Sequence, residues 1–140
     1  MDIWAFQRKV TRRLLSWSIL SIVLGFPMWL DSYRPIKNLG MQFLTWGGID
    51  AMIALFGQRS SEKRQAKLDD PYAPDVVANE TKKLRRILWL NTFLDVGYMA
   101  GGGWMLAQDE ETRRGHGVGV LIQGGFLFFF DLWHALRLRK

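Results

Sequence analysis

Three aspartates lie inside long apolar stretches of this 140-residue chain. Asp50, Asp95 and Asp131 are the only acidic residues within four runs that contain no lysine or arginine. A charged carboxylate at the centre of a membrane costs roughly 2.5–3.5 kcal/mol on insertion scales. We therefore expect the three side chains to face the interior of a helical bundle, where they are either protonated or paired with another group.

The three aspartates also occur at similar depths in their runs. Counted from the basic end of each run, they lie about five to eight residues in, which at 1.5 Å per residue is roughly 8–12 Å. No lysine or arginine occurs within the runs to neutralise them, so their candidate partners are two neutral amides, a phenol and one imidazole. The candidate proton- or cation-binding residues are Asp50, Asn91, Asp95, Tyr98, Gln123, Asp131 and His134.

Two main interpretations of these side chains remain open. In the first, they bind or relay protons or cations, because ionisable groups inside a membrane are functional hypotheses by default. In the second, the carboxyl groups stay neutral and join helices through hydrogen bonds to Asn91, Gln123 or Tyr98. The first predicts a water-accessible cavity that reaches the aspartates, and the second predicts a dry core with every polar group satisfied.

The pair of Asp131 and His134 has two further interpretations. It could reach Arg137 or Arg139 at the lipid headgroups as an interfacial anchor. Its i, i+3 spacing also resembles the Glu-x-x-His motif of di-iron bundles, but those proteins use two such motifs and longer glutamates. We therefore expect no metal.

Haem and hydrolytic chemistry are also disfavoured. His116 and His134 are eighteen residues apart on one predicted helix, about 27 Å, so they cannot ligate one haem iron from both sides. No serine, histidine and carboxylate lie together at one depth as a triad would require. The sequence favours a non-enzymatic role, and we expect no cofactor.

Composition narrows the class of protein. The chain has no cysteine, which excludes disulfides, thiolate nucleophiles and Cys-ligated metal centres. Seven tryptophans and nine phenylalanines are typical of side chains at lipid interfaces. The net charge of +6 comes from clusters that flank the apolar runs, which favours anionic lipid headgroups over nucleic acid as the partner.

The four apolar runs are long enough to be transmembrane helices. They cover residues 14–30, 39–57, 87–107 and 117–136. The length of each run matches the ~20 residues needed to cross ~30 Å of hydrocarbon. On the outer face of a soluble bundle, charged residues would recur every three or four positions, and here they do not. We therefore predict an all-α integral membrane four-helix bundle that forms a single domain over residues 1–140.

Basic residues set the predicted orientation. Of the nineteen lysines and arginines, four precede the first run, eight lie in a loop at 58–86 and three follow the last run. By the positive-inside rule both termini and the loop 58–86 lie in the cytoplasm, which for a bacterial protein means a multi-pass protein of the inner membrane. The first run is longer than a signal h-region and lacks a cleavage site, so we expect it to be retained.

Two flanking segments carry local predictions. The N-terminal "MDIWAFQRKVTRR" is either an interfacial helix that mixes apolar and basic residues or a frayed basic tail. In the middle loop, Pro71 and Pro74 end any helix that continues from the second run. Asp75 is predicted to cap a new helix that leads into the third run.

Internal similarity suggests two helical hairpins in tandem. "TRRLLSWSIL" from Thr11 resembles "LRRILWLNTF" from Leu84 at an offset of 73, and "LTWGGID" from Leu44 resembles "LIQGGFL" from Leu121 at an offset of 77. Copies with two spans each would keep one orientation, which defines a parallel repeat. The alternative is chance similarity between apolar segments.

Small and polar residues recur at helical spacing in every run. Helices in membranes associate through close approach at small residues and through polar contacts, so these stripes should face one another. The stripes consist of Ser18, Ser21 and Gly25; Gly47, Asp50, Ala54 and Gly57; Asn91, Asp95, Tyr98 and Gly102; and Gly117, Gly124 and Asp131.

The third and fourth runs also carry a resemblance. "GHGVGVLIQGGFLFFFDLWHA" and "LNTFLDVGYMAGG" resemble small uncharacterised bacterial proteins with four predicted membrane spans. This resemblance implies architecture and no activity. We expect a proton- or cation-linked, transporter-like membrane site, with a non-catalytic structural or assembly subunit of a larger membrane complex as the alternative. Four short spans enclose little interior, so in the bilayer we expect a homo-oligomer or a complex subunit.

Overall fold

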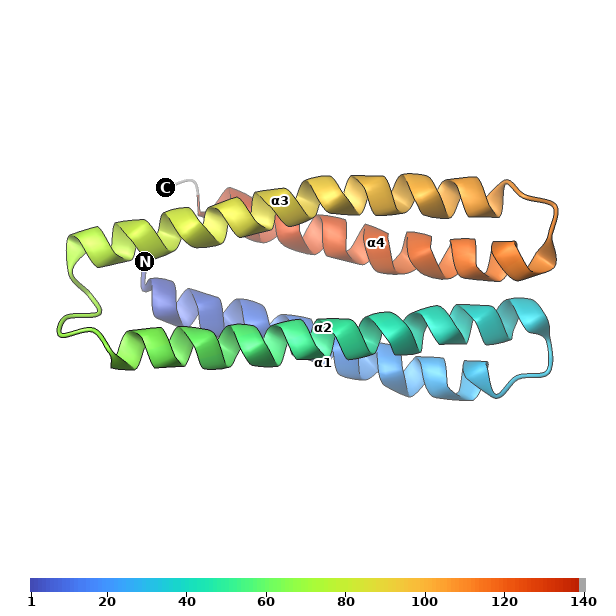
Figure 1. The fold of residues 1–140 in the computed structure, drawn as a ribbon, viewed down its shortest axis with the longest axis horizontal. Helices are drawn as coiled ribbons and strands as arrows, with labels where there is room; N and C mark the ends of the chain where they lie inside the picture. Colours follow the sequence, from blue (N-terminus) through green and yellow to red (C-terminus); the bar gives the residue numbers. More distant parts are fainter. Residues whose placement is uncertain (139–140) are drawn as a thin grey trace.

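Four long helices make up the computed structural model, which describes residues 1–138 (Figure 1). They are α1 (Ile3–Trp29), α2 (Arg34–Ala66), α3 (Pro74–Leu106) and α4 (Glu111–Arg137). No strand occurs in this part of the chain, so the predicted all-α class is confirmed.

The helices form two hairpins, α1–α2 and α3–α4, that lie side by side (Figure 1). The two short hairpin connections, residues 30–33 and 107–110, lie at one end of the molecule, which we call the hairpin end. The N-terminus, the end of α4 and the α2–α3 connection lie at the opposite end, the terminal end. The hairpins meet mainly through α2 and α4, with a smaller contact between α1 and α3.

The helices extend beyond the predicted spans. Residues 58–86, predicted to be a loop in which a helix begins near Asp75, are helical on both sides of a short connection at 67–73. The α2 and α3 helices each contain 33 residues, about 50 Å at 1.5 Å per residue. The residues on both sides of the connection continue as helix because their polar side chains pack against α1.

The start of α3 differs from the prediction. Ala73 is the N-cap residue and makes no side-chain hydrogen bond, while Pro74 occupies the first turn. The prediction that Asp75 caps this helix is wrong. Proline suits this place because its missing N–H would have no helical partner there. Asp75 lies within the first turn, where its negative charge favours the positive end of the helix dipole.

The N-terminal segment forms the first turns of α1, so the predicted frayed tail is wrong, while the interfacial position of this helix stays a prediction. Asp2 caps α1 by accepting hydrogen bonds from the backbone N–H groups of Trp4 and Ala5. The Trp4 indole is fully buried and its Nε1 donates to the carbonyl oxygen of Pro71 at 2.8 Å. Apolar packing thus holds the start of α1 in the bundle. The buried cluster at this end consists of Ile3, Trp4, Leu88, Ala135 and Leu138.

Reciprocal glycine contacts hold each hairpin together. A Cβ atom added to Gly40 would lie 2.8 Å from the carbonyl oxygen of Gly25. In the second hairpin, a Cβ atom on Gly117 would lie 2.8 Å from the carbonyl oxygen of Gly102. The two pairs correspond at an offset of 77 residues. Both hairpins therefore bring their helices into backbone contact at the same place.

The same offset also relates contacts between the hairpins. Gln123 donates from Nε2 to the Ser21 hydroxyl at 3.1 Å, and the equivalent residues Trp46 and Tyr98 pack edge to face with ring centroids 4.6 Å apart. A single offset of 77 residues therefore relates α1 to α3 and α2 to α4. The alternative alignment, which places Thr11 on Leu84, is displaced by four residues, about one helical turn.

Most of the predicted small and polar stripes are buried between helices. Ser18, Ser21 and Gly25 of α1 are examples, as are their partners on α2. Tyr98 and Gly57 are exceptions, because both remain exposed at the gap between α2 and α3.

Two helices, α2 and α4, are long and apolar enough to cross a membrane by length and composition. Within the two apolar stretches, 28% and 39% of the residues are buried. The apolar part of α1 is short because it begins only after Arg13. The α3 helix is less apolar because it contains Asn91, Asp95 and four glycines.

Candidate functional site

Carboxyl groups from three helices meet between the hairpins. Asp50 of α2, Asp95 of α3 and Asp131 of α4 line one cavity of about 210 Å³. Their exposed fractions are 2%, 7% and 6%. The Asp131 carboxyl group shares this cavity wall with Asp95 and the Asn91 amide. Residues spread over 82 positions of the chain therefore form one compact acidic group.

Two oxygens of this acidic group have no partner. Asp50 Oδ2 and Asp95 Oδ2 are buried and accept no hydrogen bond from any described residue. Within residues 1–138, no lysine, arginine or histidine forms an ion pair with these aspartates. Buried carboxylates require a compensating partner. Protons or a bound cation must therefore offset the charge of the group.

The remainder of this cavity wall is aromatic and aliphatic. The rings of Trp46 and Tyr98 lie on one side of it and pack edge to face against each other. Leu14, Ile53 and Leu94 supply aliphatic surface. The carboxyl groups thus face a space that is mostly apolar, where electrostatic interactions are stronger than in water.

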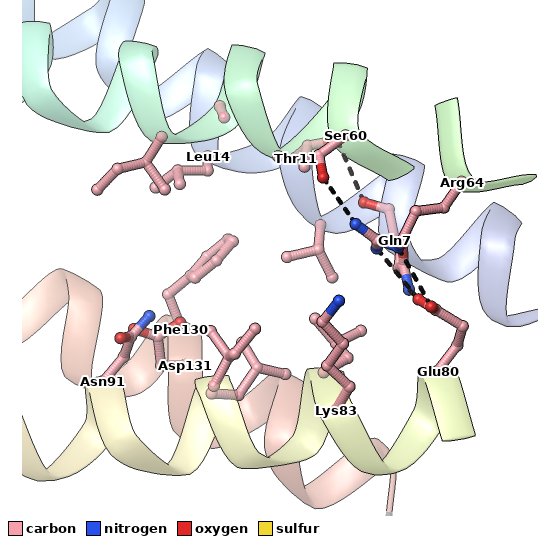
Figure 2. Close-up of a pocket in the computed structure, with 17 residues that line it drawn as sticks. Gln7, Thr11, Leu14, Ser60, Arg64, Glu80, Lys83, Asn91, Phe130 and Asp131 are labelled. Atoms are coloured by element: carbon pink, nitrogen blue, oxygen red, sulfur yellow. Dashed lines mark hydrogen bonds and ion pairs between the residues drawn. The ribbon is translucent and has the colours of Figure 1, made fainter. Parts of the chain in front are cut away.

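A second cavity connects this group to the terminal end. Its volume is about 370 Å³, and it shares Leu14, Ile53, Asn91 and Asp131 with the first cavity. Figure 2 shows Asn91 and Asp131 at one end of this space and the side chains of the terminal end at the other, with the Lys83 side chain extending between them. The two adjoining cavities, which we call the hollow, extend from the terminal end to the aspartates.

Hydrogen bonds close one side of the mouth of this hollow. Arg64 donates to Glu80 from Nε at 3.2 Å and from Nη2 at 3.1 Å, and Gln7 donates to Glu80 at 3.1 Å. The Ser61 hydroxyl donates in turn to the Gln7 side-chain oxygen. This mouth network of Gln7, Ser61, Arg64 and Glu80 ties α1, α2 and α3 together.

Glu80 is ionised over a wide pH range in this network. Burial by itself raises the pKa of Glu80, but hydrogen bonds from Arg64 and Gln7, together with the charges of Arg64 and Lys83, lower it below its usual value. The mouth therefore keeps a charged, hydrogen-bonded acid about four helical turns from Asp95, a distance of roughly 22 Å along α3.

The hairpin end is packed instead of hollow. A Cβ atom on Gly119 would lie 2.5 Å from the Cβ atom of Gln42, so α2 and α4 touch there. The Asn38 amide donates to the carbonyl oxygen of Thr112 at 3.1 Å. None of these residues lines either of the two cavities. Both cavities therefore lie on the terminal side of this contact.

His134 does not join the aspartates. Its Nδ1 lies 2.7 Å from the carbonyl oxygen of Phe130, and its Nε2 lies 3.2 Å from Arg13 Nη1. A guanidinium can only donate, so Nε2 accepts and Nδ1 carries the hydrogen. This neutral imidazole faces α1 and does not contact Asp131. His134 and Asp131 therefore do not form a joint metal or anchor site.

The predicted arginine partners of that pair also lie elsewhere. Arg137 places its guanidinium 4.5 Å from the centroid of the Trp133 ring, a cation–π contact. Arg139 lies outside the described residues.

Gln123 serves as a connector between helices. Its Oε1 accepts from Trp17 Nε1 at 2.9 Å, and its Nε2 donates to the Ser21 hydroxyl at 3.1 Å. Both bonds join α4 to α1, away from the aspartates. Five of the seven predicted site residues therefore line the carboxylate cavity, and they are Asp50, Asn91, Asp95, Tyr98 and Asp131.

The 77-residue offset shows how the two gaps between the hairpins differ in their residues. Trp17 and Phe126 stack with ring centroids 3.8 Å apart and fill the gap between α1 and α4. Their equivalents across the gap between α3 and α2 are Leu94 and Ile49, which are smaller. The equivalent of His134 is Gly57, which lines the larger cavity. Aromatic residues thus fill one gap, and smaller residues leave the other open.

The acidic residues also differ between the two hairpins. At the offset of 77, Asp95 corresponds to Ser18, Asp131 to Ala54 and Asp50 to Leu127. None of the three has an acidic counterpart. The chain therefore has one acidic group in a scaffold of two similar halves.

Sequence reasoning missed the mouth network and Trp46. The signal for the network was present, because Asp50, Ala54, Gly57, Ser61 and Arg64 follow one another at helical spacing on a single face. Because the predicted span ended at residue 57, Ser61 and Arg64 were not assigned to the same helix face as Asp50. No comparable signal distinguished Trp46 from the other tryptophans.

Comparison with known proteins gives one match. A family described as "Family of unknown function (DUF6992)" matches residues 13–132, a range that includes all three aspartates of the cavity. No curated protein and no solved structure matches the chain.

Proposed function

The chain belongs to DUF6992, a family of unknown function. We propose from its site that it is a membrane protein that binds protons or cations at its buried carboxyl groups. We propose further that it moves them across the membrane in a transporter-like cycle. The observation that carries this proposal is the convergence of Asp50, Asp95 and Asp131 on one cavity with two unpartnered oxygens. The expected uncharacterised family is confirmed, while the four spans and the bacterial inner membrane remain part of the proposal.

Exposed apolar surface supports insertion of all four helices. Val23 of α1, Phe56 of α2, Phe93 of α3 and Phe129 of α4 are each more than 60% exposed. Contiguous apolar surface on this scale marks contact with lipid or with a partner. Acyl chains around every helix would cover it, including α1 and α3, whose interior faces hold the less apolar residues.

The orientation follows from the charges. Basic residues are concentrated at the terminal end, so the positive-inside rule places the termini and the α2–α3 connection in the cytoplasm. The 33-residue helices exceed the ~30 Å of hydrocarbon, so the mouth network would lie at or beyond the inner headgroups. Cytoplasmic water and ions would then reach the aspartates through the hollow.

A purely structural role for the carboxyl groups fits less well. A scaffold needs its buried polar atoms satisfied, because a partly satisfied polar network is less stable than an apolar core. Asp50 Oδ2 and Asp95 Oδ2 are unsatisfied, and a cavity adjoins them. These features favour an exchangeable ligand over fixed bridging hydrogen bonds.

The test is ion movement in liposomes that contain the purified chain. Cation gradients should drive a change in internal pH, read with a trapped pH-sensitive dye, and Asp95→Asn should abolish it. Asp69→Asn, which removes an exposed acid from the connection at 67–73, should retain full activity. The proposal fails if wild type and empty liposomes give the same signal.

A further inference from the structure

The shape and lining of the carboxylate cavity indicate what kind of cation it accepts. We propose that the cavity binds a hydrophobic organic cation, an ammonium group that carries apolar substituents. This inference rests on the proposed function and deepens it by naming the class of ligand.

The need for positive charge comes from the acidic group. Asp50 and Asp95 are more than nine-tenths buried, both line the cavity, and each has a carboxyl oxygen with no hydrogen-bond partner among the described residues. Asn91 is the neutral amide in the same wall, and it donates no hydrogen bond to either of these oxygens. A ligand with one positive charge would satisfy oxygens that the chain leaves without a partner.

The rest of the wall distinguishes an organic cation from a bare metal ion. Hard cations such as Ca²⁺ take six to eight oxygen ligands, and Mg²⁺ requires an octahedral set. Besides the carboxyl groups, however, this cavity is lined by the rings of Trp46 and Tyr98 and the aliphatic side chains of Leu14 and Leu94. Aromatic faces attract ammonium groups, and apolar walls bury the substituents of such a ligand.

The available volume suits a small molecule. The carboxylate cavity of about 210 Å³ adjoins the cavity of about 370 Å³, where Val10, Ile87 and Leu88 supply apolar wall and the charged groups of the mouth lie at the far end (Figure 2). Small-molecule sites typically occupy roughly 300–1,000 Å³ and combine apolar walls with a few polar groups. The charged head would lie at the aspartates and the apolar body along the hollow.

The asymmetry of the repeat shows that this space follows from particular residues. Ile53 lines both cavities, and its equivalent at the offset of 77 is Phe130. Ile53→Phe therefore places an aromatic side chain in the open gap. The equivalent helix position in the other hairpin already carries phenylalanine, at Phe130. This variant should fill part of the cavity while the fold is retained.

The experiment uses benzyltrimethylammonium as the probe, titrated calorimetrically into the purified full chain in detergent. Saturable binding should weaken about tenfold or more in Asp95→Asn and in Ile53→Phe, and it should be unchanged in Asp69→Asn. Benzenesulfonate, an aromatic anion, should not bind. Circular dichroism establishes that each variant is folded, and Trp46→Leu gives a second test of the aromatic wall without altering the carboxyl groups.

Failure of this inference can be told apart from failure of the proposed function. If liposomes show ion movement that depends on Asp95 but the probe does not bind, the inference is overturned and the proton or inorganic-cation function stands. If the probe binds equally to wild type, Asp95→Asn and Ile53→Phe, binding occurs elsewhere and the inference is also overturned. If both the liposome signal and probe binding are absent, both proposals fall.

Discussion

Asp50 of α2 and Asp95 of α3 line the same cavity and each has a buried Oδ2 atom without a hydrogen-bond partner, although the two helices belong to different hairpins. The hairpins touch at the hairpin end and leave a hollow toward the terminal end. The acidic group therefore lies where the packed half of the bundle meets its open half.

Neutralising one member of the acidic group should stabilise the fold while removing its function. Like charges in a buried site repel, so Asp95→Asn should raise stability by roughly 1 kcal/mol. For a chain of this size, that corresponds to a rise of about 3 °C in Tm. Thermal unfolding in detergent at neutral pH checks this, and a lower Tm would instead mean that Asp95 makes a necessary structural bond.

Enlarging the reciprocal glycines should separate the helices of a hairpin. A side chain on Gly40 would meet backbone atoms of Met28 and Gly25, so Gly40→Val should destabilise the fold by about 1–3 kcal/mol. Gly48→Ala is the matched control on the same helix, since a Cβ atom there meets nothing within 4 Å. Its higher helix propensity should make Gly48→Ala neutral or slightly stabilising. Equal losses of Tm in both variants would contradict the packing described here.

The mouth network should lose its contribution to stability in acid. The pKa of Glu80 is lowered in the folded state from an ordinary value of 4.5, so its contribution is fully present above pH 4.5 and is lost as the pH falls through the folded pKa. The difference in Tm between wild type and Glu80→Gln should be constant from pH 7 to about 5 and then shrink. The exposed Glu62→Gln should show no such trend, and a difference that persists in strong acid would refute the assignment.

Access to the hollow should come from one side. The chain has no cysteine, so a single introduced thiol can be labelled without background. Gly57→Cys lies at an exposed position in the wall of the larger cavity and should react with a membrane-impermeant thiol reagent added on the side of the termini. Val120→Cys, packed against Gly102, should resist labelling from both sides. Labelling of Gly57→Cys only from the opposite side would reverse the proposed direction of access.

Much of this site could be predicted from residue type and spacing. Aspartates at matching depth in apolar helices can be satisfied only inside the bundle, and this constraint places Asp50, Asp95 and Asp131 together. The glycine stripes likewise predicted where helices approach, because a glycine without a Cβ atom leaves room for another backbone. Both signals are local to one helix and survive folding.

Other features depend on how the hairpins pack, which spacing alone does not fix. Gln123 and His134 share helix α4 with Asp131, but small differences in their angle around the helix direct them to Trp17 and Arg13 of α1. Arg64 and Glu80 are far apart in sequence and pair only because α2 and α3 continue as helices past the predicted spans. The burial of Trp4 likewise depends on the returning α3 and α4.

The most direct test of the central claim is proton release when a cation is added to the purified chain in weakly buffered detergent solution. One shared site predicts that wild type releases protons and that Asp50→Asn, Asp95→Asn and Asp131→Asn each remove most of the signal. Independent losses of about a third in each variant, or no release from wild type, would contradict the claim that these carboxyl groups act together.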